Sequence, residues 1–342
     1  MGYELFMMKE QFYVQWHVTN RCNLRCRHCY QDDFSQASEL DWPELSKVAH
    51  HLLESVKGWG KTACIHLTGG EPLLKAEIIR LLERLDRDSA VAELGMITNG
   101  LLLNQQALRR LTSYSKLRKI KISLDGANAA TNDTIRSRGT FQRVVETIRL
   151  AKQEERFEVI IMFTLMRSNF RELIPLIQLC QDLGVNGLIL ERFIPLGKGR
   201  GILDQVLTKD DWKEFVASLS SFFSIDPSEP QLLPYQAFQI QFPDGEPELL
   251  GAPCTIGKDG LCLMPDGGVF PCRRFPVSIG NLIEEPLETV WERSDLLQAL
   301  RRRASLKGQC GSCKIEGCLG CRSLAYSLSG DPFSEDPHCR RK

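Results

Sequence analysis

The sequence lacks long hydrophobic runs and carries no excess of charge of either sign. No apolar stretch approaches the roughly 20 residues of a membrane-spanning helix. Residues 1–10 have neither the basic start nor the long apolar segment of a secretion signal. The 43 basic and 43 acidic residues cancel, so bulk charge predicts neither a nucleic acid nor an anionic membrane as partner. We therefore expect a cytoplasmic location.

Cysteine, in contrast, is abundant, with 13 among 342 residues. Three cysteines lie near the start of the chain, eight fall between Cys254 and Cys339, and Cys64 and Cys180 stand alone. In a chain of this length without a secretion signal, such numbers favour metal sites over disulfides. The two isolated cysteines lie in apolar segments, where we expect them to be buried core residues.

The first cysteine group has the spacing Cys22-x3-Cys26-x2-Cys29 and follows a β-like run at residues 12–18. Three thiolates on one loop suit an iron–sulfur cluster, because iron binds soft sulfur ligands. A four-iron cluster would keep one iron open for a non-protein ligand. The alternative is a zinc knuckle completed by His17 or His28, which is less favoured because this spacing is not a usual zinc spacing.

At these residues the chain resembles the radical S-adenosylmethionine enzymes, with His28 in place of the aromatic or similar residue of their signature. The resemblance implies a [4Fe–4S] cluster held by Cys22, Cys26 and Cys29, with S-adenosylmethionine on the open iron. Reductive cleavage of the sulfonium would give a 5′-deoxyadenosyl radical that abstracts hydrogen from the substrate. An external electron donor such as flavodoxin or ferredoxin is implied as a partner.

Residues 12 to about 200 alternate short β-branched runs with helical patterns. The predicted strands are 12–18, 63–67, 93–98, 119–124, 159–165 and 187–191, and the predicted helices are 43–56, 76–86, 105–112, 141–152 and 171–183. This alternation predicts an α/β fold with parallel strands joined by right-handed crossovers. Six units are too few for an eightfold barrel, and the resemblance implies a partial (β/α)6 barrel.

Unusual residues follow the predicted strands, where barrels of this kind gather their function. The second strand ends in a Gly-Gly-Glu-Pro run, the third in Asn99-Gly100 and the fourth in Ser123-Leu124-Asp125-Gly126. By resemblance, the cofactor-binding residues are Gly69, Gly70, Glu71, Asn99, Ser123, Arg136 and Phe193.

The resemblance also implies a role for most of these side chains. Glu71 would accept a bond from the ammonium of S-adenosylmethionine, Ser123 would contact its ribose or carboxylate, and Arg136 would pair with the carboxylate. Phe193 or Ile194 would pack on the adenine. The alternatives are a plain turn at Asn99-Gly100, a solvated charge at Arg136 and barrel core at residues 193 and 194.

A proline-rich stretch separates this half from the second cysteine group. Residues 208–223 are predicted to be a helix, and Pro227, Pro230, Pro234, Pro243 and Pro247 follow it and break regular structure. We therefore predict three parts: a radical S-adenosylmethionine core at 1–205, a connector at 206–250 and a cysteine-rich domain at 251–342.

In the last part, an Asp266-Gly267 turn predicts a β-hairpin, and a helix is expected at about 286–297. The cysteine pattern resembles the SPASM extension of radical S-adenosylmethionine enzymes, although two gaps are one residue shorter than in that family. The resemblance implies two auxiliary [4Fe–4S] clusters. The first would be held by Cys254, Cys272 and Cys321, and the second by Cys310, Cys313, Cys318 and Cys339. Cys262 is either a fourth ligand of the first cluster or a core residue, and two zinc ribbons are the non-redox alternative.

Auxiliary clusters suggest an electron sink, so we predict a net oxidation or a bond-forming reaction. The main hypothesis is a maturase of a peptide or protein. The short segment before the first strand suggests that a leader peptide would need a separate recognition protein or a different mode of recognition. Arg273 stands where sulfatase-maturing enzymes have Asp, which weakens a formylglycine-forming activity.

Two other functions stay open. One is the modification of a small cofactor precursor such as a tetrapyrrole, and the other is a zinc-binding scaffold without catalysis. Arg273 and Arg274 would suit a carboxylate-bearing substrate, unless they form a solvated edge. The sequence identifies no catalytic acid or base.

Overall fold

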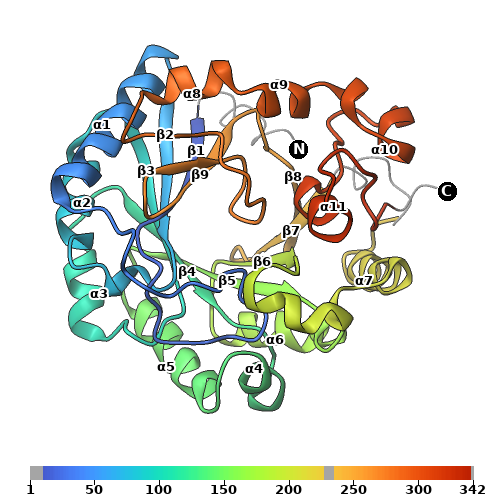
Figure 1. The fold of residues 1–342 in the computed structure, drawn as a ribbon. Coiled ribbons are helices and arrows are strands. Elements are labelled where there is room, and N and C mark those ends of the chain that lie inside the picture. Colours follow the sequence, from blue (N-terminus) through green and yellow to red (C-terminus); the bar gives the residue numbers. More distant parts are fainter. Residues whose placement is uncertain (1–10, 227–234, 340–342) are drawn as a thin grey trace.

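Figure 1 shows an incomplete ring of strands with helices packed around its outside. The computed structural model describes residues 11–226 and 235–339. The strands are β1 (Gln11–His17), β2 (Thr62–Thr68), β3 (Val91–Thr98), β4 (Leu117–Ser123), β5 (Glu158–Leu165), β6 (Gly187–Arg192), β7 (Tyr235–Gln241), β8 (Glu248–Pro253), β9 (Gly260–Leu263), β10 (Gly268–Phe270) and β11 (Gly280–Asn281). The α-helices are α1 (Trp42–Gly58), α2 (Ile78–Arg87), α3 (Gln105–Leu111), α4 (Ala129–Ile135), α5 (Thr140–Gln153), α6 (Leu173–Asp182), α7 (Lys209–Phe222), α8 (Leu287–Arg293), α9 (Asp295–Arg301), α10 (Gly308–Ser312) and α11 (Arg322–Ser329). Short 3-10 helices are η1 (Pro72–Leu74), η2 (Phe170–Glu172), η3 (Gly197–Gln205) and η5 (Arg303–Ser305).

Strands β1 to β6 form the parallel part of one sheet. Each pairs in parallel with the next strand along the chain, and helices α1 to α6 lie in the crossovers between them. This arrangement confirms the predicted α/β fold with a partial barrel of six parallel strands. No helix within the described residues has both the length and the apolar character that a membrane crossing requires.

The sheet continues beyond these six strands at both edges. Strand β7 is antiparallel to β6, and β8 is antiparallel to β7. At the other edge β9 pairs in parallel with β1 and begins the predicted hairpin with β10, to which β11 is added. The full order is β11-β10-β9-β1-β2-β3-β4-β5-β6-β7-β8, so the chain returns from its C-terminal part to its first strand.

The residues assigned to a connector therefore carry a helix and two strands of the main sheet. Helix α7 begins at a capping box between Thr208 and Asp211, as the sequence predicts. Strand β7 buries Phe238 and Ile240 at alternate positions. Residues 227–234, with three of the prolines, and residues 1–10 lie outside the described part. The domain boundaries stay predictions.

Local sequence signals explain where several helices begin. Helix α1 starts at a capping box between Asp41 and Glu44, with Pro43 in its first turn. The single helix expected at about 286–297 is instead two helices, α8 and α9. Ser294 lies between them in an extended conformation, and its side chain accepts from the backbone N–H of Leu297, which starts a new helix.

The main core lies between the strands and the surrounding helices. Alternate strand residues such as Val14, Ile65 and Ile120 are fully buried in this layer with α1 residues such as Leu52. Because side chains alternate along a strand, the residues between them face the inside of the barrel. A smaller core of Ile256, Phe275, Leu297 and Leu300 supports the C-terminal cysteine-rich part.

Candidate functional site

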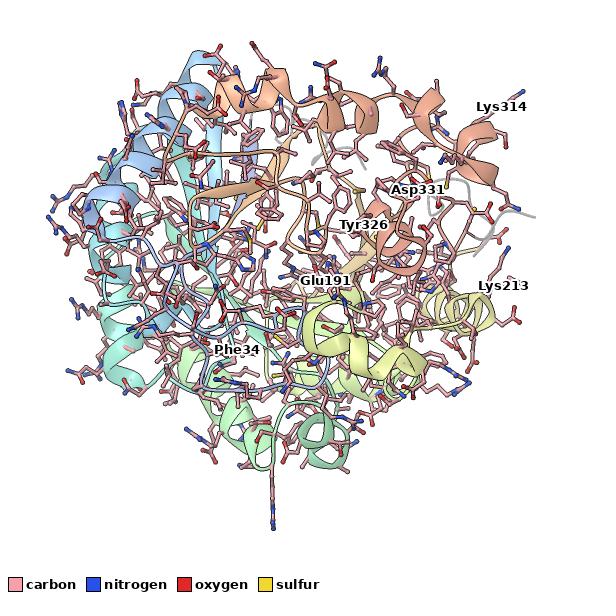
Figure 2. All side chains as sticks on the ribbon, in the orientation of Figure 1. Phe34, Glu191, Lys213, Lys314, Tyr326 and Asp331 are labelled. Atoms are coloured by element: carbon pink, nitrogen blue, oxygen red, sulfur yellow. The ribbon has the colours of Figure 1, made fainter. Side chains whose placement is uncertain are left out.

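A cavity opens at the carboxyl ends of the parallel strands, where a barrel of this kind places its active site. The volume available to water-sized molecules is about 130 Å³, and the cavity is open to solvent. Figure 2 labels two of its lining residues, Phe34 and Glu191, inside the ring of helices. The residues predicted from the sequence that line it are Cys22, Cys26, His28, Cys29, Gly69, Gly70, Asn99, Ser123, Arg136, Phe193, Ile194, Arg273 and Arg274.

The cysteine loop is held against the end of β2 by backbone contacts. The N–H of Gly70 donates to the carbonyl of Thr19 at 2.8 Å, and the N–H of Glu71 donates to the carbonyl of Arg21 at 2.8 Å. A Cβ on Gly70 would lie 2.2 Å from the carbonyl oxygen of Arg21. Only glycine allows this approach, so the glycines at this strand end position the cysteine loop as well as lining the cavity.

The donor set of this loop fits an iron–sulfur cluster. Three free thiols line one cavity, and polar groups lie around their sulfur atoms. The Leu24 N–H lies 3.4 Å and the Asn99 Nδ2 3.8 Å from the Cys22 Sγ, and the Arg136 Nη1 lies 4.0 Å from the Cys26 Sγ. Such donors stabilise anionic thiolates bound to iron.

The distances between ligand atoms also favour an iron–sulfur cluster over a single zinc ion at the cysteine loop. In residues 11–226 and 235–339, there is one group of three His, Cys, Asp or Glu side chains whose ligand atoms all lie within 4.8 Å of one another. None of the three loop cysteines belongs to this group. The two histidines considered as zinc ligands have other neighbours, although His28 lines the same cavity as the cysteines. His28 faces Asp125, with Nε2 3.2 Å from Oδ2, and His17 is buried with its ring 5.6 Å from that of Tyr30.

Glu71 lies behind the cavity wall rather than on it. Its carboxylate accepts from the Thr98 hydroxyl at 2.8 and 2.9 Å, from the Asn99 N–H at 2.9 Å and from the Leu73 N–H at 3.3 Å. Burial raises the pKa of Glu71 to about 7, against these hydrogen bonds, which lower it. The observed contacts give Glu71 a role in holding the end of β3, and its bond to the ammonium stays a prediction.

Arg136 is not a solvated charge, because its side chain is only 8% exposed. Its Nε lies 2.7 Å from the Oδ2 of Asp125, which is fully buried at the end of β4. Burial lowers the pKa of His28 to about 4, against the effect of Asp125, so this ring is neutral near pH 7. Sequence analysis missed the function of Asp125. The available signal was an acidic side chain two residues after the end of a strand.

The other predicted cofactor-binding side chains are those of Ser123, Asn99 and Phe193. Ser123 lines the cavity at the end of β4. Asn99 also lines it, and its Nδ2 donates to the Asn23 Oδ1 at 2.7 Å, which joins this turn to the cysteine loop. Phe193 lines the cavity but is only 2% exposed and packs with Ile135 and Met166. It is therefore a core residue at the cavity edge, and its contact with adenine stays a prediction.

Two arginines from the C-terminal part reach the same cavity. The Arg273 guanidinium pairs with Glu191 and lies 5.5 Å from the Tyr30 ring centroid. Arg274 donates from Nη1 to the Arg192 carbonyl at 2.9 Å, and its Nη2 lies 3.7 Å from Glu191 Oε1. Their side chains are 10% and 20% exposed, so the solvated-edge interpretation is wrong.

The C-terminal cysteines fall into two groups of neighbours. Cys254 lies within electrostatic range of Cys272 and Cys321, and burial raises its pKa to about 12. Cys318 has Cys310 and Cys313 as neighbours. These neighbours match the two sets implied by the resemblance, whose assignment as ligands stays a prediction.

Two other cysteines complete this region. Cys262 is buried on β9, with Sγ 3.6 Å from the Leu263 carbonyl, and Cys272 is an electrostatic neighbour. It therefore lies beside the first group without being fixed as its fourth ligand. The backbone N–H of Cys339 donates to the Asp336 carbonyl at 3.0 Å. All 13 cysteines are free thiols, as expected for metal sites rather than disulfides.

Comparison with known proteins agrees with this geometry. Residues 16–180 match the radical SAM superfamily, and residues 254–314 match SPASM, an iron–sulfur cluster-binding domain. The chain is 30% identical over 345 residues to the AdoMet-dependent heme synthase of Methanosarcina barkeri, covering 95% of each protein. It is 26% identical to the mycofactocin maturase MftC of Mycobacterium tuberculosis, covering 95% of this chain and 82% of that protein.

The fold itself has a solved counterpart. The structure of native anSMEcpe with bound AdoMet aligns with a TM-score of 0.72 at 18% identity, over 96% of this chain and 94% of that one. The chain therefore belongs to the radical S-adenosylmethionine superfamily, as an enzyme that binds a [4Fe–4S] cluster and S-adenosylmethionine and carries auxiliary iron–sulfur clusters in a SPASM domain.

Proposed function

We propose that the enzyme oxidatively modifies a carboxylate-bearing tetrapyrrole precursor. The observation that supports it is the charge at the cavity, where Arg273 and Arg274 lie beside the single carboxylate of Glu191. The likeness to a heme synthase over 95% of both chains supports the same substrate class. This choice places the cofactor-precursor hypothesis ahead of the peptide hypothesis, which the sequence alone favoured.

The charges of Glu191, Arg273 and Arg274 define what the cavity can bind. Burial raises the pKa of Glu191, but the two arginines lower it more, so the net pKa lies below its usual range. Glu191 is therefore anionic, and the group of three keeps one positive charge. Arg274 is the more exposed of the two arginines and has the weaker contact with Glu191. We assign it to a substrate carboxylate.

Other residues of the chain position the reaction. When bound, the cluster and S-adenosylmethionine supply the 5′-deoxyadenosyl radical that removes a hydrogen atom from the substrate. Asp125 fixes Arg136 where it can pair with the carboxylate of S-adenosylmethionine. Phe193 and Ile194, directly after β6, provide an apolar part of the cavity wall. The C-terminal cysteines would hold the electron acceptors that complete a two-electron oxidation.

A peptide or protein substrate is the second candidate. The likeness to the mycofactocin maturase MftC favours it, and a peptide carboxylate would suit the same arginines. A separate leader-recognition protein, an external donor such as flavodoxin or ferredoxin, and a cytoplasmic location all stay predictions.

The test is substrate-dependent formation of 5′-deoxyadenosine by the anaerobically reconstituted enzyme. The probes are a porphyrin with free propionate side chains, its methyl ester and an acidic peptide, each with S-adenosylmethionine and a reductant. We expect the free acid to stimulate deoxyadenosine formation and to be converted, whereas the ester is inert. Stimulation and conversion by the peptide alone would replace the proposal with the second candidate.

A further inference from the structure

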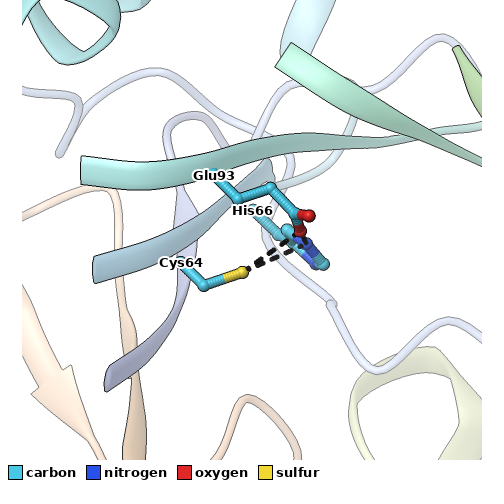
Figure 3. A group of neighbouring side chains, drawn as sticks. All are labelled: Cys64, His66 and Glu93. Carbon is cyan, nitrogen blue, oxygen red and sulfur yellow. Dashed lines mark hydrogen bonds and ion pairs between the residues drawn. The ribbon is translucent and has the colours of Figure 1, made fainter. Parts of the chain in front are cut away.

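A second group of ligand-type side chains lies inside the barrel, away from the cysteine loop. Figure 3 shows Cys64 and His66 on β2 beside Glu93 on β3. The Cys64 Sγ is 3.4 Å from Glu93 Oε1 and 3.8 Å from His66 Nε2, and that nitrogen is 3.8 Å from the same Oε1. The three atoms thus form a nearly regular triangle.

These distances are close to those around one metal ion, although the contacts of the Cys64 Sγ with Glu93 and His66 are also within hydrogen-bonding distance for sulfur. A tetrahedral zinc ion with bonds of about 2.0 to 2.3 Å places its ligand atoms about 3.3 to 3.7 Å apart. The His66 Nε2 lies too far from the Glu93 Oε1 for an ordinary hydrogen bond. A thiolate, an imidazole and a carboxylate together are a donor set that zinc accepts.

The surrounding backbone is shaped for the histidine. Cys64 is directly opposite Glu93 in the strand register, and His66 is opposite Gly95. A Cβ at residue 95 would lie 2.5 Å from the His66 Cδ2 and 2.8 Å from its Nε2. The Tyr13 hydroxyl lies 2.9 Å from the His66 Nδ1 and can accept a hydrogen bond from Nδ1–H, which leaves Nε2 free to bind a metal.

The charge around the group also has to be compatible with a cation. Lys119 lies 3.0 Å from the other oxygen of Glu93, Oε2, and so leaves Oε1 available. Lys121 is close by, and burial lowers its pKa to about 8. It therefore stays mostly protonated near pH 7, where it opposes a cation but lowers the pKa of the Cys64 thiol, which burial raises. A thiolate and a carboxylate carry two negative charges against the two positive charges of the ion. Because Cys64 also releases its proton, binding adds one positive charge to this part of the interior, beside the ion pair of Glu93 with Lys119. Glu93 is 22% exposed, which gives the ion a way in.

We propose that Cys64, His66 and Glu93 bind one zinc ion inside the barrel, separate from the iron–sulfur clusters. Binding replaces the thiol proton of Cys64, which leaves to solvent, and involves no redox change. Cys64 precedes the Gly69 turn by five residues of β2, or about 16 Å of strand. The ion would therefore tie β2 to β3 below the cavity, and the expected role of Cys64 as a simple core residue would be replaced by a ligand role.

The test is the zinc content of the full, anaerobically reconstituted protein after dialysis against a weak chelator. We expect about one zinc ion per chain in the wild type. Cys64→Ser and Glu93→Gln should lose it without losing iron or sulfide. The matched control is Cys180→Ser, a buried cysteine of α6 outside the group, which should keep its zinc. Glu93→Gln provides a second variant at a partly exposed position should Cys64→Ser fold poorly.

Zinc absorption spectroscopy distinguishes this site from zinc that has entered a cluster site. The expected shell has one sulfur at about 2.3 Å and nitrogen or oxygen atoms at about 2.0 to 2.1 Å. An all-sulfur shell, equal zinc in Cys64→Ser, or no zinc uptake when one equivalent of zinc chloride is added to the wild type would each overturn the proposal.

Discussion

The two cysteine groups of this enzyme differ in their access to the cavity. Cys22, Cys26 and Cys29 all line it, whereas in the part of the chain that the structure describes no cysteine beyond residue 250 does. An open position on a metal centre is useful only where a ligand can reach it. On the proposed function, the first group holds the centre that meets S-adenosylmethionine, and the second holds centres that accept electrons.

The two groups are also supported differently. The N-terminal loop rests on the close backbone contact at Gly70. In the C-terminal part, the buried Arg322 donates to the Cys310 Sγ at 3.4 Å and to the carbonyls of Pro332 and Ser334 at 2.9 and 2.6 Å. The N-terminal loop is therefore held mainly by backbone contacts with neighbouring strand ends, while a buried arginine side chain links the segments of the other region.

The largest effect is expected for Cys26→Ala. Removing one of three ligands should abolish the cavity cluster and lower 5′-deoxyadenosine formation at least about a thousandfold. The measurement is anaerobic deoxyadenosine production with S-adenosylmethionine and dithionite. Cys180→Ser is the control and should be active. Residual activity near the wild-type level in Cys26→Ala would remove this loop from catalysis.

Gly70→Ala should weaken the loop support by crowding the backbone. The added methyl group would lie 2.2 Å from the Arg21 carbonyl oxygen, and such overpacking costs about 3 kcal/mol. We expect lower stability in urea unfolding and partial loss of iron. The matched control is Gly201→Ala, since nothing lies within 4 Å of a Cβ there. Equal stability of the two variants would contradict the support argument.

Cys310→Ala tests the electron-acceptor side of the comparison. Because this cysteine lies away from the cavity, S-adenosylmethionine should still be cleaved, but product formation should fall about a hundredfold. The ratio of deoxyadenosine to product, measured with the porphyrin acid, reports this uncoupling. If both products fall together, the two cysteine groups do not have separate roles.

Arg274→Lys should weaken only the binding of the substrate. Lysine keeps the charge but loses the planar fork that binds a carboxylate, so KM for the porphyrin acid should rise about tenfold. Deoxyadenosine formation without substrate should stay unchanged. Arg109→Lys, on the exposed side of α3, serves as the control. An unchanged KM would take Arg274 out of substrate binding.

Glu71→Gln should give the smallest effect, and one that depends on pH. In the folded protein Glu71 holds its proton up to about pH 7, whereas its ordinary pKa is 4.5. Its stabilising contribution is therefore complete below pH 4.5 and is lost as pH rises through 7. Relative to wild type, the variant should gain about 1 kcal/mol between pH 6 and pH 8.

The measurement for Glu71→Gln is urea unfolding of the holoprotein at several pH values, with the exposed Glu146→Gln as control. A constant difference between Glu71→Gln and wild type across this range would show that Glu71 is ionised throughout.

The sequence predicted the features that depend on local pattern. The six parallel strands, the cysteine loop and the residues at strand ends all follow from alternation and spacing within short segments. The pairing of β9 with β1 and the contact of Arg273 with Glu191 were not predictable, because they join residues far apart in the chain. Likewise, Cys64 looked like a core residue because its polar neighbours on β1 and β3 are visible only in the folded sheet.

The central claim is that the loop of Cys22, Cys26 and Cys29 holds its own cluster beside two others. The most direct test is anaerobic iron and sulfide quantification with Mössbauer spectroscopy, on wild type and on the variant with all three cysteines changed to alanine. Three [4Fe–4S] clusters predict about twelve irons falling to about eight. An iron content that does not fall in the variant would contradict the claim.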